Sequence, residues 1–158
     1  MKIKLVVIGT IYTDFNNRSD VPIQARHANE HLGRVELLEE YERGLKALDG
    51  FSHAHLIYFF HHQKRYNLTV KPVVTETSKG IFATRAPARP NPLGTSIVEL
   101  VSVKKNIIMF RGVDIMNNTP LLDIKPYVHE FDTRTRANCG WYDSVANSQI
   151  ARGASDPY

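Results

Sequence analysis

The sequence predicts an all-β protein, mainly β with one short helix, that closes into a small single-sheeted β-barrel. Two observations support this prediction. Six to eight short segments rich in Val, Ile and aromatic residues follow one another, separated by polar or Gly/Pro-containing stretches. A single segment has helical spacing, and strands do not alternate with long helices as they do in a doubly wound sheet. A Rossmann fold is therefore not expected.

The expected strands are segments of high β propensity. In chain order they are 4–12, a strand that begins at Gly33, 53–60, 68–76, 80–84, two strands within 95–115 that turn at 104–106, and 119–132. The one expected helix covers 39–50, "EEYERGLKALDG", where apolar residues recur at helical spacing and Gly50 stands at a C-terminal stop.

Length and composition bound the class of protein. With 158 residues, of which 42% are hydrophobic, the chain is expected to form one domain with a substantial core. No apolar run approaches the roughly 20 residues that span a bilayer, and the first residues are interpreted as a strand rather than a signal peptide. The single Cys139 excludes an internal disulfide and a cysteine-based zinc site. A cytoplasmic protein with no membrane partner is the simplest inference.

Charge is unevenly distributed along the chain. The formal net charge is +4, but residues 53–98 hold six Lys or Arg and one acid, Glu76, whereas residues 30–49 hold six acids and three bases. A basic centre of this kind favours a polyanionic partner, because phosphate contacts release condensed counterions. The alternative is a solvated basic face without a partner.

The stretch 80–96, "GIFATRAPARPNPLGTS", combines rigidity with positive charge. Two arginines and three prolines lie within residues 85–92. Each proline fixes its own φ and restricts the residue before it, so the loop is expected to be ordered before a ligand binds. The Arg85 and Arg89 guanidinium groups suit carboxylate or phosphate. The alternative is a rigid connector whose arginines pair with surface acids.

Histidines and the segment "LLDIKPY" raise further possibilities. His61 and His62 are adjacent at the end of a strand, so they point to opposite faces and are not expected to share a metal ion. Asp123 and Lys125 are expected on one face of the last strand. They could form an exposed pair of little consequence, or they could hold a zwitterionic ligand or provide a general base at a pocket rim. Neither a Gly-x-Gly-x-x-Gly fingerprint nor a P-loop occurs.

Three stretches together carry a family resemblance: "GLKALDGFSHAHLIYFFHH", "GIFATRAPARPNPLGTSIVEL" and "TPLLDIKPY". They resemble the TsaA-like (YaeB/VirR-type) domain, the core of the TrmO family of S-adenosylmethionine-dependent tRNA methyltransferases. The resemblance covers residues 7–127 and implies a TsaA-like β-barrel domain at 1–135 with a C-terminal tail at 136–158. It also implies a homodimer with S-adenosylmethionine bound near the subunit interface. The implied reaction methylates the exocyclic nitrogen of threonylcarbamoyl-adenosine next to the anticodon of threonine tRNA.

The resemblance also implies residue roles. The usual basic residue of the Pro-x-Gln element is Ile23 here, so one polar contact is expected to be missing. Cofactor contacts are expected at Pro22, Ile23, Gln24, His61, His62, Arg85, Thr95, Leu122, Asp123, Ile124 and Lys125.

The chemistry of methyl transfer suggests further roles. Asp123 and His61 are the candidate general bases for a urea-like acceptor nitrogen. RNA contacts are expected at Arg89, Lys79, Lys64 and Arg65. Two alternatives remain open: a non-enzymatic barrel that binds single-stranded RNA, and a methyltransferase that acts on a small molecule.

Overall fold

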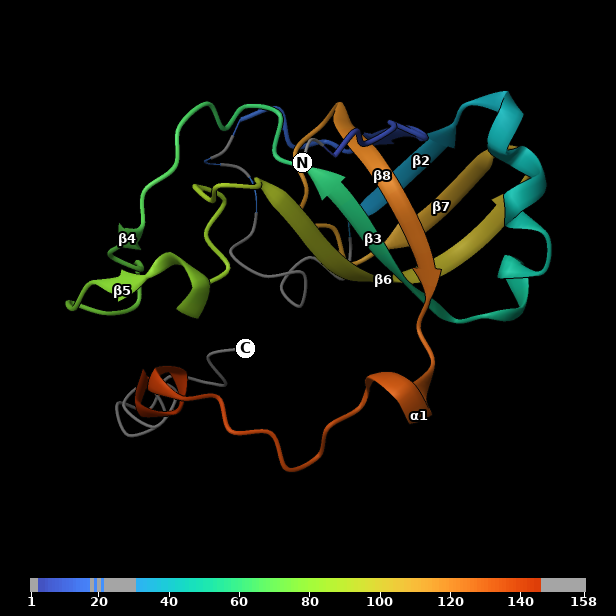
Figure 1. Cartoon of the computed structure of the whole chain (residues 1–158). Coiled ribbons are helices and arrows are strands. Elements are labelled where there is room, and N and C mark those ends of the chain that lie inside the picture. Colours follow the sequence, from blue (N-terminus) through green and yellow to red (C-terminus); the bar gives the residue numbers. More distant parts are fainter. Residues whose placement is uncertain (1–2, 18, 20, 22–30, 146–158) are drawn as a thin grey trace.

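Six antiparallel strands close into a barrel in the order β1, β2, β7, β6, β3, β8 (Figure 1). A computed structural model of the chain describes residues 3–17, 19, 21 and 31–145. The sheet closes because β1 pairs with β2 on one side and with β8 on the other. The barrel strands are β1 (Gly9–Tyr12), β2 (Leu32–Leu37), β3 (His53–Phe59), β6 (Leu93–Lys104), β7 (Ile107–Arg111) and β8 (Thr119–Pro126). The predicted single-sheeted barrel is confirmed.

Alternation along the strands places one set of side chains inside the barrel. In β3, Ala54, Leu56 and Tyr58 are buried, while the residues between them are partly exposed. Such a period of two is what a half-buried strand requires. The other strands contribute inward residues in the same way, and the core they form includes Ile11, Val35, Val98, Ile108, Phe110 and Leu121.

A β-bulge interrupts this alternation in β8. Tyr58 of β3 pairs with Leu121, but the preceding Ile57 pairs with Asp123, so Leu122 is an extra residue on β8. A bulge of this kind bends the strand and redirects the side chains that follow it. Beyond the bulge, Asp123 points outward beside Ile57, and Ile124 packs against the core.

The predicted helix at 39–50 is replaced by two 3-10 helices, η3 (Glu39–Leu45) and η4 (Leu48–Gly50). Leu45 and Leu48 are buried, so the apolar spacing identified the correct inward residues. Between the two helices, Ala47 has the left-handed φ of 69°, which a continuous right-handed helix does not allow. The chain therefore turns at Ala47, and both helices cover the same end of the barrel.

Three predicted strands are shorter than expected. Within 4–12, the strand begins only at Gly9, and within 68–76 only β4 (Thr69–Val70) is a strand. The segment 80–84 contributes Gly80 to β5 (Lys79–Gly80) and continues as the 3-10 helix η5 (Ile81–Ala83). Pro72 lies two residues after β4 and has no N–H to donate to a neighbouring strand, so the strand cannot continue through it. β4 and β5 pair only with each other and lie beside the barrel (Figure 1).

The chain leaves the barrel after β8 and passes along one side of it (Figure 1). The predicted final strand ends at Pro126, and the short helix α1 (His129–Asp132) follows. His55 Nε2 on β3 lies 3.4 Å from Asp132 Oδ2, and the Tyr127 ring packs 5.7 Å from the His55 ring. Among the described residues, no helix is both long and apolar enough to cross a bilayer.

Candidate functional site

The segment 80–92, here called the strap, is held by hydrogen bonds to its own backbone. Ile81 is almost fully buried and anchors η5 at one end. Arg89 folds back over this turn, and its Nη1 donates to the carbonyl oxygens of Ile81 (3.1 Å) and Thr84 (2.8 Å). The Arg89 guanidinium also lies 5.8 Å from the centre of the Phe82 ring. The strap is therefore braced by one of its two arginines in addition to its prolines.

The histidine pair lies beside the strap. The Phe60 N–H donates to the carbonyl of Pro92 at 2.8 Å, which joins the end of β3 to the end of the strap. The rings of His61 and His62 follow directly, with centroids 3.9 Å apart. The prediction that they point to opposite faces is wrong, because β3 ends at Phe59 and both histidines lie in the turn that follows it. Partial burial and the neighbouring His62 lower the pKa of His61 below its usual 6.5. His61 is therefore mostly neutral at pH 7, with one ring nitrogen able to accept a proton.

Arg85 faces a partly buried polar cluster at the strap end of the barrel. Ser96 Oγ donates to Asp114 Oδ1 at 2.6 Å, and the Tyr58 hydroxyl lies 3.0 Å from Ser96 Oγ. Burial raises the pKa of Asp114 and raises that of Tyr58 to about 12. The positive charge of Arg85 lowers the pKa of each, so its guanidinium lies near both groups. Within the described part of the chain, Arg85 makes no hydrogen bond or ion pair of its own.

Sequence reasoning missed this polar cluster. Tyr58 belongs to an apolar strand in the sequence pattern, and neither Ser96 nor Asp114, which follows β7, stands in a motif that marks it. The alternation of a strand could have revealed it. Ser96 and Val98 are two residues apart in β6 and share a face, so the Ser96 hydroxyl points into the core. A buried hydroxyl needs a hydrogen-bonding partner, and Asp114 is the carboxylate that provides one.

The Asp123–Lys125 pair lies on the outer face of the barrel. The two side chains share one face of β8, as predicted, and form an ion pair of 2.8 Å. Ile57 of β3 pairs with Asp123 on one side and with Thr95 of β6 on the other, so all three lie in one row across the strands. The bulge described above places Asp123 in this row.

A groove of about 470 Å³ lies at the η3–η4 end of the barrel. Its walls are mostly apolar, with charged side chains at Glu40, Lys46 and Asp123. Arg85 and the histidine pair do not line it, because β3 runs from the η3–η4 end at His53 to the strap end at Phe59. The predicted cofactor residues thus fall into two groups in one chain. The strap-end group is His61, His62 and Arg85, and the β8 group is Leu122, Asp123, Ile124 and Lys125, with Thr95 alongside.

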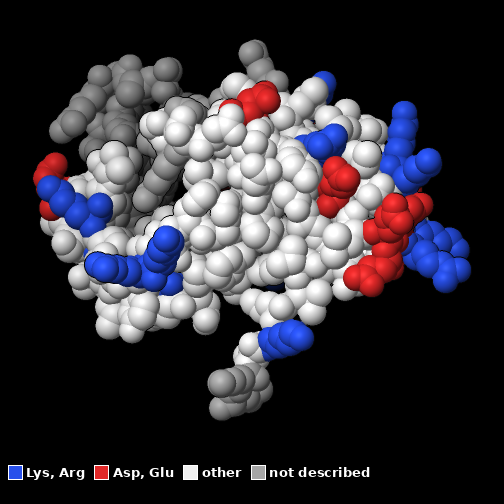
Figure 2. All heavy atoms as spheres, turned by 90° about the horizontal axis from the view of Figure 1, so that it is seen from above, with Lys and Arg blue, Asp and Glu red and all other residues white. Residues whose placement is uncertain are grey.

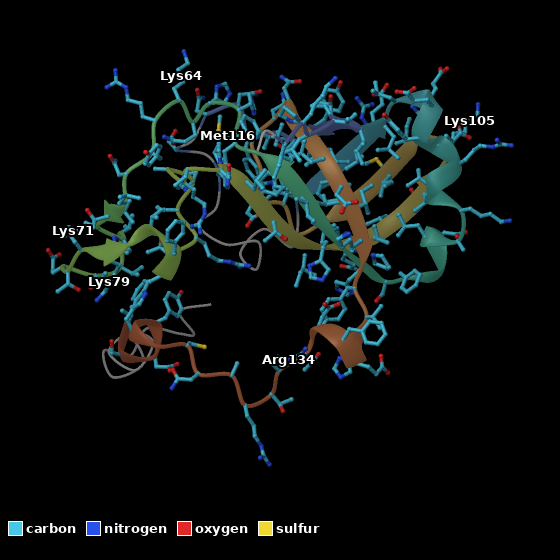
Figure 3. The ribbon with its side chains drawn as sticks, viewed as in Figure 1. Lys64, Lys71, Lys79, Lys105, Met116 and Arg134 are labelled. Atoms are coloured by element: carbon cyan, nitrogen blue, oxygen red, sulfur yellow. The ribbon has the colours of Figure 1, made fainter. Side chains whose placement is uncertain are left out.

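The remaining predicted residues have varied surroundings. Pro22, Ile23 and Gln24 lie outside the described residues. Lys64 and Arg65 are exposed, and Lys64 points away from the barrel (Figure 3). No three His, Cys, Asp or Glu side chains among the described residues are placed to hold a metal ion.

The charged side chains are segregated over the surface. Over η3 and η4, at the right edge of Figure 2, Lys and Arg stand among several acids. Over the β4–β5 side, at the left, fewer acids accompany them. One of those acids is Glu76, which pairs with Lys71 at 2.5 Å. Three lysines of the basic centre seen in the sequence, Lys64, Lys71 and Lys79, lie on this side of the molecule (Figure 3).

Comparisons with known proteins place this geometry in context. A family model described as the tRNA-methyltransferase O N-terminal domain matches residues 10–133, which include the strap and β8. The "Probable S-adenosyl-L-methionine-binding protein" of Pyrococcus abyssi is 52% identical over 86% of this chain and 74% of its own length. A "tRNA (adenine(37)-N6)-methyltransferase" of Rattus norvegicus is 33% identical over 80% of this chain and 31% of its own length.

Solved structures agree with the fold. A crystal structure of TrmO superposes with a TM-score of 0.77 at 34% identity, covering 89% of this chain. A second, of TrmO from Pseudomonas aeruginosa, has a TM-score of 0.76 at 33% identity. This chain spans 64% and 62% of those two solved chains, respectively.

Proposed function

Because the chain belongs to the tRNA-methyltransferase O family, we propose that it transfers a methyl group from S-adenosylmethionine to an adenosine of tRNA. The finer proposal is that the acceptor is the exocyclic nitrogen of threonylcarbamoyl-adenosine next to the anticodon of threonine tRNA. A bulky modified base beside an anticodon is unpaired, so an open, basic surface can reach it without melting a duplex.

The observation on which this proposal depends is the geometry around Arg85. Arg85 lies on a braced strap, its positive charge is close enough to lower the pKa of Asp114, and it has no hydrogen-bonding partner among the described residues. A guanidinium suits the carboxylate of a methionine moiety, and Asp114 suits its ammonium group. The flat rings of His61 and His62 nearby offer a stacking surface for adenine. The residues present therefore fit this cofactor.

When bound, S-adenosylmethionine supplies a methyl group already activated on a sulfonium. The protein has to hold the acceptor in line and receive the proton that the acceptor nitrogen loses. Asp123 and neutral His61 are the two candidate groups to take this proton. Lys64 and Arg65 are exposed beside the strap and are proposed to contact tRNA phosphates. Lys79 and Arg89 remain candidates for the same role, although each already contacts an aromatic ring.

A homodimer is proposed to complete the site. In one chain the strap-end group and the β8 group lie at different positions along the barrel, and the groove beside Asp123 excludes Arg85. The outer face of β6 exposes Leu93, Ile97 and Val101, an apolar surface suited to a second copy. In such a dimer, Arg85 of one subunit would approach Asp123 of the other.

The first experiment tests methyl transfer directly. The purified chain is titrated with S-adenosylmethionine in a calorimeter. It is then incubated with the cofactor and with tRNA that carries threonylcarbamoyl-adenosine without the methyl group. Mass spectrometry of the digested nucleosides should show methylated threonylcarbamoyl-adenosine. Absence of cofactor binding would contradict methyl transfer, and binding without any change in the nucleosides would contradict the tRNA substrate.

A complementation experiment tests the shared site. Arg85→Ala and Asp123→Asn are each expected to be inactive as pure proteins. After unfolding and refolding together, half of the dimers are mixed and each holds one intact site, so about a quarter of wild-type activity should return. No recovery would contradict a site built from two subunits.

A further inference from the structure

Trp141 lies on a segment that has a defined conformation of its own. Residues 141–145 are helical, and the turn before them is fixed by side chains. The Gly140 N–H donates to Asn138 Oδ1 at 2.6 Å, and the Cys139 N–H donates to Asp143 Oδ2 at 3.1 Å. Ser144 Oγ donates to the carbonyl of Trp141 at 2.7 Å. The indole ring is therefore presented from an ordered turn.

This turn is attached to the strap by the indole ring. Trp141 Nε1–H donates to the carbonyl oxygen of Ala83 at 2.8 Å. Lys79 Nζ lies 5.6 Å from the centre of the indole ring, close enough for a cation–π contact. Figure 3 shows Lys79 between β5 and this turn of the chain. Two independent contacts thus connect the tail to the segment around η5.

The indole ring is attached close to Arg85 in the chain. Ala83 ends η5 and stands two residues before Arg85. Arg89 also binds the carbonyls of Ile81 and Thr84 in the same turn. The backbone that leads to Arg85 is therefore held by hydrogen bonds from both Arg89 and Trp141. The family match ends at residue 133, so the second of these contacts comes from outside the matched region.

We propose that Trp141 is a positioning residue for Arg85, and that its indole–Ala83 contact keeps the strap in the conformation that binds S-adenosylmethionine. This inference rests on the proposed function. The contact lies outside the barrel core, where Ala83 is exposed and Trp141 half-buried. Its loss should therefore leave the barrel folded and release the strap. A strap that must be ordered on binding lowers cofactor affinity, because the ordering entropy opposes binding.

The test compares Trp141→Ala and Trp141→Phe with wild type. Removal of one such hydrogen bond should raise the Kd and the KM for S-adenosylmethionine roughly five- to tenfold. At saturating cofactor the kcat should stay within about twofold, because Trp141 touches no reacting group. Trp141→Phe keeps an aromatic ring beneath Lys79 but lacks the N–H, so most of the loss should remain. Phe131→Ala removes an exposed aromatic side chain of α1, away from this contact, and should change neither constant.

Solution spectroscopy checks the contact itself. Trp141 is the only tryptophan of the chain, so its fluorescence reports this site alone. Lys79→Met removes the ammonium group above the ring and should shift the emission. An unchanged spectrum, or wild-type affinity in Trp141→Ala, would overturn the proposal. The proposal would also be overturned if Trp141→Phe lost as much free energy of unfolding as it lost free energy of cofactor binding. Failure of the wild-type protein to bind S-adenosylmethionine would instead contradict the proposed function.

Discussion

Ser96 Oγ donates a hydrogen bond of 2.6 Å to Asp114 Oδ1 at the strap end of the barrel. Because Ser96 has one proton and gives it to Asp114, the Tyr58 hydroxyl must be the donor in its 3.0 Å contact with Ser96. The charge of Asp114 is thus solvated by a short chain of hydroxyls inside the barrel. Burial of a carboxylate costs free energy, so its presence beside Arg85 indicates a role in binding rather than in stability.

Asp114→Asn separates these two roles. The amide oxygen can still accept the hydrogen bond from Ser96, so the free energy of unfolding should fall by no more than about 1 kcal/mol. It should rise instead if the cost of burying the Asp114 carboxylate exceeds the benefit of its hydrogen bond. Affinity for S-adenosylmethionine should fall, because the ammonium group of the cofactor loses its carboxylate. Thermal denaturation and calorimetry measure the two effects. Normal affinity in this variant would remove Asp114 from the site.

The stability of the protein should also depend on pH through Asp114. Burial raises its pKa above the ordinary 3.8, so the folded protein keeps this proton to higher pH than the unfolded chain does. The resulting contribution to stability is fully present below pH 3.8 and is lost as the pH rises through the raised pKa. Wild type should therefore lose stability relative to Asp114→Asn from about pH 4 upward. Denaturant melts at several pH values would show a constant difference if the pKa were not raised.

The two arginines of the strap should respond differently to substitution. Arg85→Ala removes a guanidinium that makes no hydrogen bond or ion pair among the described residues, so cofactor affinity should fall while the melting temperature changes little. Arg89→Ala breaks two hydrogen bonds from a charged donor to backbone carbonyls, which are worth about 1.5–3 kcal/mol each when fully formed. Because Arg89 is half-exposed, a loss nearer 1 kcal/mol in unfolding free energy is expected.

RNA binding distinguishes them further. Arg89→Glu should lower tRNA affinity and flatten its dependence on salt if Arg89 also reaches phosphate. Normal tRNA binding by Arg89→Glu at low salt would assign Arg89 to the strap alone. The same measurement on Lys64→Glu serves as the comparison, because Lys64 is exposed.

Gly94 is required by the packing of the strap end. A methyl group on Gly94 would lie 2.2 Å from Tyr58 Cε2 and 2.9 Å from Phe60 Cζ. Both rings must therefore shift in Gly94→Ala, which should cost about 1–3 kcal/mol of unfolding free energy. Gly50→Ala is the matched control, since nothing lies within 4 Å of its added methyl group. A denaturant melt that gives the same midpoint for both variants would contradict this packing.

The barrel could be predicted from the sequence because the pattern that indicates a strand lies within the strand itself. Alternation in β3 assigns inward and outward residues without knowledge of partners. The same period of two predicts that Asp123 and Lys125 share a face of β8, which their ion pair confirms. Ala47 shows the limit, since nothing local indicates that it adopts a left-handed φ and divides the expected helix.

The candidate site was less predictable because it depends on long-range register. Ser96 meets Asp114 across 18 residues, and Tyr58 meets Ser96 across 38. The sequence predicts that Arg89 faces a ligand, because prolines keep its loop ordered and its guanidinium suits carboxylate or phosphate. In the folded chain Arg89 instead donates to the carbonyls of Ile81 and Thr84, because backbone acceptors compete effectively for a guanidinium.

Asp123→Asn tests the proposed general base. The ion pair with Lys125 is exposed, and such pairs contribute about 0–1 kcal/mol, so the variant should melt near wild type. If Asp123 takes the proton from the acceptor nitrogen, kcat should fall by roughly 100-fold or more, while cofactor affinity changes little. Lys125→Met is the control, because it breaks the same ion pair and leaves the carboxylate in place. A kcat in Asp123→Asn equal to that of the control would transfer this role to His61. Since the pKa of His61 lies below 6.5, the rate should then rise with pH through that lower value and level off above it.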